Sequence, residues 1–390
     1  MQRLMTDRPI YKIRKRQYGD AEFPIKVKPL EDELLSSWLI RTALEHKTAP
    51  ATFTNLYIPE TKNKLWSSDI DMHASDGLLA ALSFKSALPL EQLRSMTLKA
   101  YEGFLFEKLH ANTGGTQFIN PLGLRGRRSK LPGLRYCPYC LNEDLVPYFR
   151  KKWRLAFSVV CLKHKCYLLD RCLECGTPIM PYLSCNRGKL GNCYKCEQSI
   201  LSGKFAVYVD NSDILNSVSA LYSTLDKGFI LISGQPVSSH LYFQILHQIL
   251  KLMMSPRYGQ NMQNALDFEL PDISNLRTFE ALPAAIQSQL LNKALWLLDK
   301  WPERFIEVCC QEKVFSSELL RDLKQAPFWY WEVVVRLLYH PDRVVSENEF
   351  REAIKYMESQ GVTILEGTLS NWLGVSQVFR KRHIKLEDLM

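Results

Sequence analysis

A chain of 390 residues is longer than one hydrophobic core usually supports, so the sequence predicts two or three domains. Hydrophobic residues make up 46% of the chain and charged residues 23%, a balance typical of a folded globular protein and not of a disordered one. Lysine and arginine number 50 against 41 acidic residues, an excess compatible with a polyanionic partner that does not require one.

The chain contains no apolar stretch long enough to cross a bilayer, and its first 20 residues lack the apolar core of a secretory signal. We therefore expect a cytoplasmic or nucleoid-associated protein with no membrane partner. In such a reducing compartment, closely paired cysteines favour metal binding over disulfides.

A basic tail, residues 1–20, precedes a predicted helical domain at 21–130. In PLEDELLSSWLIRTALEHK (29–47), apolar residues recur at helical spacing behind a proline and three acids, which favour a helix start. Residues 74–109 predict two more helices, joined at a Leu-Pro step. That pair is compatible with a helix-turn-helix unit, although most proline-jointed helix pairs belong to the core.

The tail and the stretch 111–135 are candidates for contact with nucleic acid or a partner. The second stretch is rich in glycine and proline and has the composition of a linker or a binding loop. The basic residues concerned are Arg14, Lys15, Arg16, Arg125, Arg127, Arg128 and Lys130.

Eight metal-ligand candidates lie between residues 131 and 205, the expected zinc-binding domain. One set is C-x2-C followed after 20 residues by C-x2-H, and the other is C-x2-C followed after 17 residues by C-x2-C. Pairs at this spacing form knuckle turns, and two knuckles supply four ligands to one tetrahedral Zn²⁺. The predicted ligands are Cys137, Cys140, Cys161 and His164 for one ion, and Cys172, Cys175, Cys193 and Cys196 for the other.

We expect these two zinc ions to be structural. Both sets are closed, whereas catalytic zinc keeps one position open to water, and a redox C-x2-C pair needs a thioredoxin-like context that is missing. Structural zinc contributes on the order of 10–16 kcal/mol of folding free energy to small modules with little core of their own. Cys166 is an alternative ligand to His164, but C-x4-C forms a poorer knuckle.

Between the halves of the first set lies PYFRKKWRLAF (147–157), where basic residues alternate with aromatic ones. This pattern suits contact with phosphates or with an acidic protein face. The alternative is a solvated face whose aromatic rings turn into the core. The candidate contacts are Arg150, Lys151, Lys152 and Arg154.

Residues 206–390 are predicted to form a mainly helical C-terminal domain. Its Leu-Gly-Val-Ser stretch (373–376) is the sort of turn that joins the helices of a DNA-reading helix-turn-helix. Arg380 stands where an apolar residue should anchor the second helix, so an ordinary terminal helix packed by Val378 and Phe379 is the alternative. The side chains that would face a major groove are Gln377, Arg380, Lys381 and His383.

Two segments together resemble the TniQ/TnsD family. PLEDELLSSWLIR (29–41) is similar to its opening motif, and CPYCLNED (137–144), continuing through WRLAF, CLKH and CLECG, is similar to its zinc region. The match covers about residues 23–200, and its specificity comes from the order of the motifs. No motif of the family is found in 206–390.

The resemblance implies a role in DNA transposition by bacterial elements that encode a separate transposase, an AAA+ regulator and a target selector. Members of the family choose the insertion site and pass that choice to the AAA+ ATPase. Some read an attachment sequence themselves, whereas others, often as dimers, dock onto an RNA-guided CRISPR effector complex. Direct reading, docking and a homodimer all stay open on the sequence.

We therefore expect a mainly α fold with small zinc-ribbon β elements: a helix-turn-helix-like N-terminal domain, tandem zinc fingers and a C-terminal helical domain. The expected function is that of a non-enzymatic target-site adaptor. The chain has no G-x4-G-K-[ST] loop and no recognisable carboxylate triad for two-metal strand transfer. The alternatives are a zinc-containing, sequence-specific DNA-binding regulator outside transposition and, from another class, a zinc enzyme.

Overall fold

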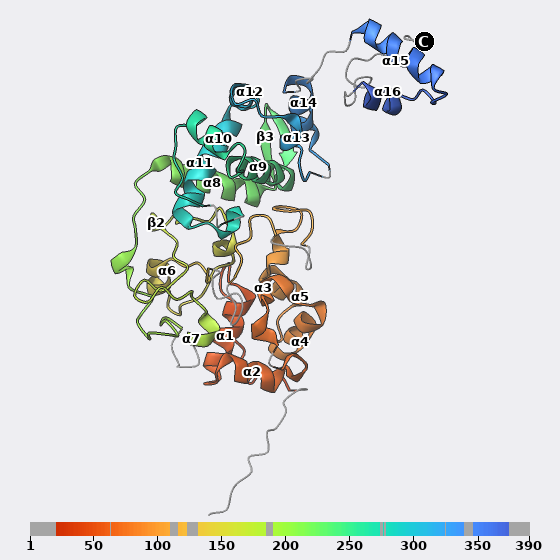
Figure 1. Ribbon diagram of the computed structural model, residues 1–390. Helices are drawn as coiled ribbons and strands as arrows, with labels where there is room; N and C mark the ends of the chain where they lie inside the picture. Colours follow the sequence, from red (N-terminus) through yellow and green to blue (C-terminus); the bar gives the residue numbers. More distant parts are fainter. Residues whose placement is uncertain are drawn as a thin grey trace, which may run out of the picture. The chain divides into compact units, whose positions relative to one another are not determined.

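The computed structural model describes residues 21–62, 64–109, 116–122, 132–184, 190–273, 276, 278–323, 325–338 and 346–373. They belong to two compact units, Met1–Glu312 and Lys313–Met390. Helices dominate the described residues of both units, and the strands form two small antiparallel sheets in the first (Figure 1). The expected mainly α fold with small β elements is confirmed; the boundaries at 130/131 and 205/206 stay predictions. None of the described helices is long and apolar enough to cross a membrane.

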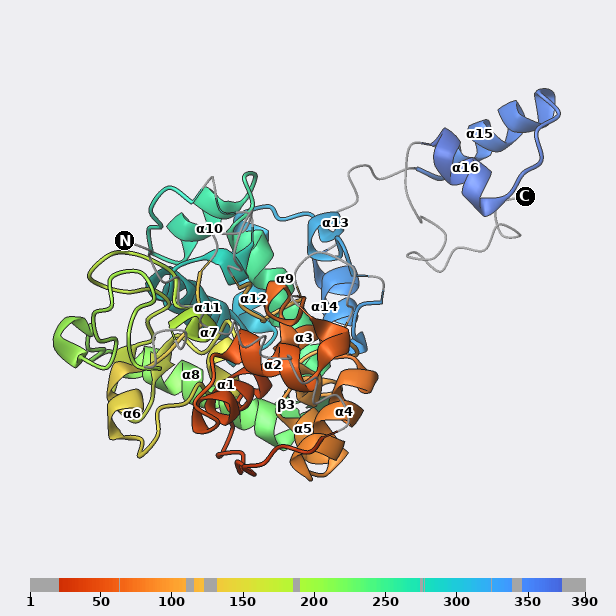
Figure 2. The same ribbon diagram turned by 90° about the horizontal axis from the view of Figure 1, so that it is seen from below.

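The first helices lie together in both views, coloured red to orange (Figures 1 and 2). They are α1 (Leu35–Glu45), α2 (Pro50–Tyr57), α3 (Ile70–His73), α4 (Asp76–Ser86) and α5 (Leu90–Ser95), with 3-10 turns at Pro59–Thr61, Leu65–Ser67 and Leu98–Tyr101. The break expected near Pro89 separates α4 from α5, and Ala87 takes a left-handed conformation there. The second helix is shorter than the sequence pattern indicates, because the chain turns extended at Thr97.

The core of these helices surrounds Trp38, which is fully buried in α1. Phe23 lies with its ring centre 4.9 Å from that of Phe53 and 5.2 Å from that of Tyr57. The Trp38 indole nitrogen donates a hydrogen bond of 2.9 Å to the carbonyl of Val27, so the segment before α1 is tied to the helix it precedes. The apolar residues predicted on one side of the 29–47 helix thus pack into an aromatic core.

Some polar residues of the same stretch are buried as well, namely Glu33, Ser36, Ser37, Arg41 and Thr42. Glu33 forms a bidentate pair with Arg41, with both N–O distances 2.7 Å, and accepts a further hydrogen bond from Ser37. The Ser37 hydroxyl in turn accepts from the backbone N–H of Phe149, and the Leu34 N–H donates to the Phe149 carbonyl. Through Glu33 and Ser37, the start of α1 therefore holds Phe149 and with it the basic, aromatic segment 147–157.

Arg154 makes a second connection between the helices and this run. Its guanidinium is 1% exposed and lies on Asp69, at 3.1 and 2.6 Å, with Asp71 at 3.6 Å and the Asn120 carbonyl at 3.1 Å. Asp71 also accepts two hydrogen bonds from Ser36 of α1. Burial, reinforced by the charge of Asp69, raises the pKa of Asp71 to about 6.

The zinc region contains little regular structure. Its elements are α6 (Pro138–Glu143), a 3-10 turn at Lys151–Arg154, β1 (Val160–Cys161), β2 (Cys166–Tyr167), α7 (Pro181–Ser184) and a 3-10 turn at Gly203–Phe205. The two strands pair antiparallel, with Cys161 opposite Cys166. Ribbons this short need another source of stability.

The rest of the first unit packs α8 (Ser212–Lys227), α9 (Ser239–Met253) and α11 (Ala284–Asp299) together, with α10 (Gly259–Ala265), a 3-10 turn at Phe279–Ala281 and α12 (Glu303–Gln311). A hairpin of β3 (Phe229–Ile232) and β4 (Gln235–Ser238) interrupts the helical pattern expected there. Its two-residue turn needs positive φ at both positions, 48° at Ser233 and 80° at Gly234.

Phe118 joins the zinc region to these helices. Its ring packs edge-on against Phe157, Phe243 and Phe279, and its N–H donates to the buried carboxylate of Glu280 at 2.9 Å. The described parts of residues 21–312 are therefore connected through shared cores and buried polar contacts.

The second unit contains α13 (Ser316–Leu319), α14 (Phe328–Leu337), α15 (Glu347–Ser359) and α16 (Glu366–Trp372). Ser346 and Glu349 form a capping box at the start of α15. Phe350, Met357 and Leu369 are buried between α15 and α16. The predicted turn at 373–376 lies outside the described residues after Leu373.

Replacing Arg154 with methionine should destabilise the protein by about 3–5 kcal/mol, because the buried Asp71 and the half-buried Asp69 would lose their cation. Urea unfolding of the zinc-loaded protein measures this. Since a carboxyl whose pKa is raised by burial gains protons in the folded state, the loss should be smaller at pH 5 than at pH 7.5.

The control is Arg94→Met, which removes an exposed arginine from Glu91 and should change the free energy of unfolding far less, because water screens that pair. Equal losses in the two variants would contradict a structural role for Arg154.

Candidate metal centres and basic cleft

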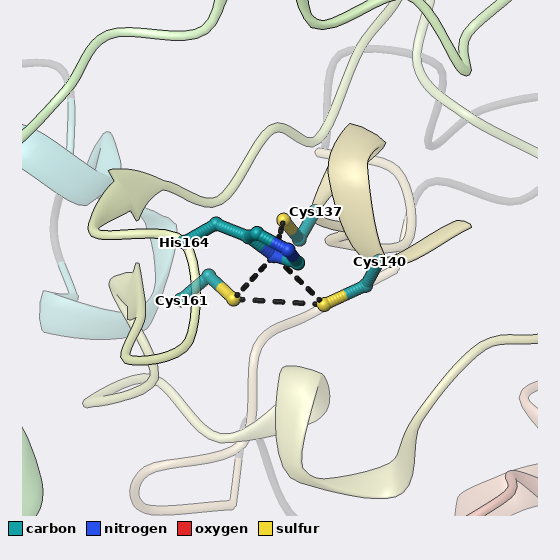
Figure 3. Close-up of side chains that lie close together, drawn as sticks. All are labelled: Cys137, Cys140, Cys161 and His164. Carbon is teal, nitrogen blue, oxygen red and sulfur yellow. Dashed lines mark hydrogen bonds between the residues drawn. The ribbon is translucent and has the colours of Figure 1, made fainter. Parts of the chain in front are cut away.

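The first metal centre is assembled from α6 and from the turn between β1 and β2 (Figure 3). Cys137 and Cys140 stand at the start of α6, Cys161 ends β1, and His164 lies in the turn. The His164 Nδ1 atom is 3.4, 3.3 and 3.5 Å from the sulfur atoms of Cys137, Cys140 and Cys161. All four donor atoms lie within 4.8 Å of one another, as the spacing predicts.

These distances fit a tetrahedral zinc ion. With Zn–S bonds near 2.3 Å and Zn–N bonds near 2.0 Å, a tetrahedron has S–S edges of about 3.8 Å and S–N edges of about 3.5 Å. The S–S distance between Cys140 and Cys161 is 3.6 Å, and the three S–N distances are equally close. When bound, the ion would supply charge neutralisation for the thiolates and a cross-link between the two segments.

Cys166 carries a fourth sulfur close to this centre. It is fully buried on β2, with its sulfur 3.7 Å from that of Cys137. The four mutually close donors include His164 and not Cys166, so the histidine completes the set.

The second centre consists of Cys172, Cys175, Cys193 and Cys196, whose donor atoms also lie within 4.8 Å of one another. The sulfur atoms of Cys172 and Cys196 are 3.6 Å apart, and those of Cys175 and Cys193 are 3.7 Å apart. Both distances suit the edges of a zinc–sulfur tetrahedron. Two structural zinc ions are therefore compatible with the protein, one bound by three cysteines and a histidine and one by four cysteines.

Three of the ligand pairs lie in turns that are closed by the same backbone hydrogen bond. In each, the residue four positions after the first ligand donates its N–H back to that ligand's carbonyl: Lys165 to Cys161 at 2.7 Å, Gly176 to Cys172 at 2.8 Å, and Glu197 to Cys193 at 3.0 Å. These three residues all have positive φ, between 49° and 68°. The turn brings the ligand pair to one side without help from distant residues, which is why spacing alone reveals it.

Glu143 is a feature of the first centre that the sequence analysis missed. Its Oε1 lies 2.9 Å from Nε2 of His164, and its Oε2 lies 2.5 Å from Nζ of Lys163. The hydrogen bond from Lys163 and then the one from His164 lower the pKa of this exposed carboxyl. An acid three residues after Cys140, on the same helix, is the only sequence signal of this role.

A cleft with a volume of about 520 Å³ opens beside the first centre, and its wall includes Cys140 and Cys161. We call it the basic cleft, because one arginine and three lysines line it against two aspartates. The charged residues are Arg150, Lys151, Lys152, Lys163, Asp32 and Asp226. Tyr101 and Tyr222 add aromatic surface.

The predicted contact residues 150–154 occupy three different environments. Arg150 pairs with Asp144 at 2.7 and 3.1 Å and lies over the ring of Trp153, so it is held in place. Lys151 donates to the Ser95 carbonyl at 2.5 Å, and burial lowers its pKa. Lys152 is exposed.

Arg154 lies beneath the surface on Asp69, so its charge is used inside the protein. The remaining predicted contact residues lie outside the described part of the chain. They are Arg14, Lys15, Arg16, Arg125, Arg127, Arg128, Lys130, Gln377, Arg380, Lys381 and His383.

Comparison with known proteins gives a match to a family model over part of the chain. The family model described as TniQ matches residues 24–168, a stretch that contains the helices α1–α5, the basic run and all four donors of the first centre. No curated protein matches the chain.

We expect Cys137→Ser and Cys193→Ser each to bind about one Zn²⁺ per chain instead of two, because each removes one ligand from one closed site. Both should also lose stability, and metal analysis with thermal unfolding measures the two effects. His164→Ala should behave like Cys137→Ser.

Cys166→Ser is the matched control, because it removes a neighbouring sulfur that is no member of the set, and it should keep both ions. If Cys166→Ser lost an ion and His164→Ala kept both, Cys166 and not His164 would be the fourth ligand of the first centre.

Proposed function

We propose that this TniQ-domain protein is a non-enzymatic target-site selector, which connects a chosen DNA site to the AAA+ regulator of a transposition system. The match to the TniQ model supports a transposition-associated function, because the TniQ family is one of non-catalytic transposition adaptors. The match over residues 24–168 is the observation that carries the proposal. In our proposal the site is marked either by its own sequence or by an RNA-guided CRISPR effector complex.

The arrangement of the matched segment supports an adaptor. The helical core and the first metal centre are joined by buried polar contacts, namely Ser37 with Phe149 and Arg154 with Asp69. A metal-braced segment fixed in this way can present a surface to a partner without changing shape. Both candidate zinc sites are closed by four protein donors, which suits bracing better than catalysis.

The basic cleft is our candidate for contact with nucleic acid. Lysines position a protein on phosphates without specifying sequence, which suits a protein that receives its target from another component. Lys152 is exposed at the cleft, and Lys151 is half-buried beside it. Arg154 takes no part in this proposal, since its charge is neutralised by the half-buried Asp69 and the buried Asp71.

Binding assays with purified components test the function. On random duplex DNA the protein alone should bind weakly, and binding should strengthen when an AAA+ regulator or an RNA-guided complex of the same transposition system is added. Tight, sequence-specific binding that no partner changes would instead indicate a DNA-binding regulator outside transposition. Size measurement of the complexes would show whether one copy or two take part.

Lys152→Ala should weaken binding to a duplex of arbitrary sequence and lower the slope of log affinity against log salt by about 0.9, the value for one lost phosphate contact on B-DNA. Fluorescence anisotropy at several salt concentrations measures this. Lys300→Ala, an exposed lysine at the end of α11 that does not line the cleft, is the charge-matched control. If both variants keep the same salt slope as the parent protein, the cleft is not the DNA contact.

A further inference from the structure

A single carboxylate joins the first metal centre to the edge of the basic cleft. Glu143 meets the Nε2 atom of His164 at 2.9 Å with one oxygen and the Nζ atom of Lys163 at 2.5 Å with the other. Lys163 lines the cleft, together with the metal-site residues Cys140 and Cys161. The cleft wall and the metal centre therefore share Cys140 and Cys161.

The ring of His164 could present either of its two nitrogen atoms to the three thiols. Its Nδ1 points at them, and its Nε2 points away toward Glu143. A neutral imidazole carries one proton, so a ring that binds metal through Nδ1 must carry that proton on Nε2. An acceptor at Nε2 selects this tautomer and this ring orientation, and Glu143 supplies the acceptor.

Glu143 also connects the two halves of the ligand set. It is the last residue of α6, three residues after Cys140, whereas His164 belongs to the turn that follows Cys161. Its hydrogen bond therefore spans the gap between the two segments that a metal ion would cross-link.

We propose that Glu143 is a positioning residue of the first metal centre: by holding His164 with Nδ1 toward the thiols it raises the affinity of this site for zinc, and it thereby stabilises the wall of the basic cleft. The contact with Lys163 is a separate, exposed ion pair with little effect on the metal. The part that concerns the cleft rests on the proposed function, and the part that concerns the metal does not.

Zinc affinity is the first test. Glu143→Ala removes the acceptor, and loss of such an outer contact typically weakens metal binding about 10–100-fold. Glu143→Gln keeps an amide oxygen that can accept from Nε2, so its affinity should stay close to that of the parent protein. Lys163→Ala removes the ion pair alone and should leave the zinc affinity unchanged.

Competition of the full-length protein with a chromophoric chelator measures these affinities. The four-cysteine centre is an internal reference, because Glu143 makes no described contact with it and its ion should be withdrawn at the same chelator concentration in every variant. Co²⁺ substitution adds a spectroscopic readout, in which the band of the three-cysteine, one-histidine site should change in Glu143→Ala and persist in Glu143→Gln. Parental affinity in Glu143→Ala, or an equal loss in Lys163→Ala, would overturn the proposal.

DNA binding under buffered free zinc is the second test. Glu143→Ala and Glu143→Gln remove the same charge, so they differ only in the contact with His164. At limiting zinc the alanine variant should bind random duplex DNA more weakly than the glutamine variant, and at saturating zinc the two should agree. Equal binding of the two variants at every zinc concentration would refute the effect on the cleft. Absence of DNA binding in the parent protein would count against the proposed function. In that case the zinc affinities would still decide the role of Glu143.

Discussion

The first metal centre brings three sulfur atoms and a ring nitrogen to within 4.8 Å of one another, and deprotonated thiols keep that distance only with a cation between them. The ligands come from α6 and from a two-residue ribbon, neither of which has enough regular structure to hold its place alone. The same cysteines are buried in one core with Leu34 and Ile40 of the α1 region. A zinc ion here would thus stabilise the helical part of the protein as well as its own knuckles.

The acidic motif at the start of α1 has its explanation in this packing. Glu33 and Ser37 look like surface residues in the sequence, yet they are buried and connect Arg41 to the backbone of Phe149. Asp69 and Asp71 do the same for Arg154. Because each connection puts charge into the interior, each is stable only while both partners remain, which makes the helices and the zinc region interdependent.

This scaffold determines which charges reach the surface. Arg154 and Arg150 are paired with buried or half-buried acids, and Lys163 is paired with the exposed Glu143. Lys152 is exposed at the rim of the cleft. A cleft whose wall contains two zinc ligands has a shape that depends on the metal. In the adaptor role that we propose, such rigidity would reduce the entropy lost on binding.

The sequence by itself determined the two sets of candidate metal ligands, because a knuckle is a local turn of five residues. Its hydrogen bond runs from Gly176 to Cys172, or from Glu197 to Cys193, and depends on nothing outside the turn. The sequence also determined α1, since the helical period is a local property. The sequence pattern did not reveal the hairpin Phe229–Ser238, whose short strands lie between two long helical patterns. Only the tertiary structure decided that Arg154 is internal, because its partner Asp69 lies 85 residues earlier in the chain. The role of Glu143 was decided in the same way: a carboxylate acquires an orienting role only when folding places it against the far nitrogen of a ligand from another segment.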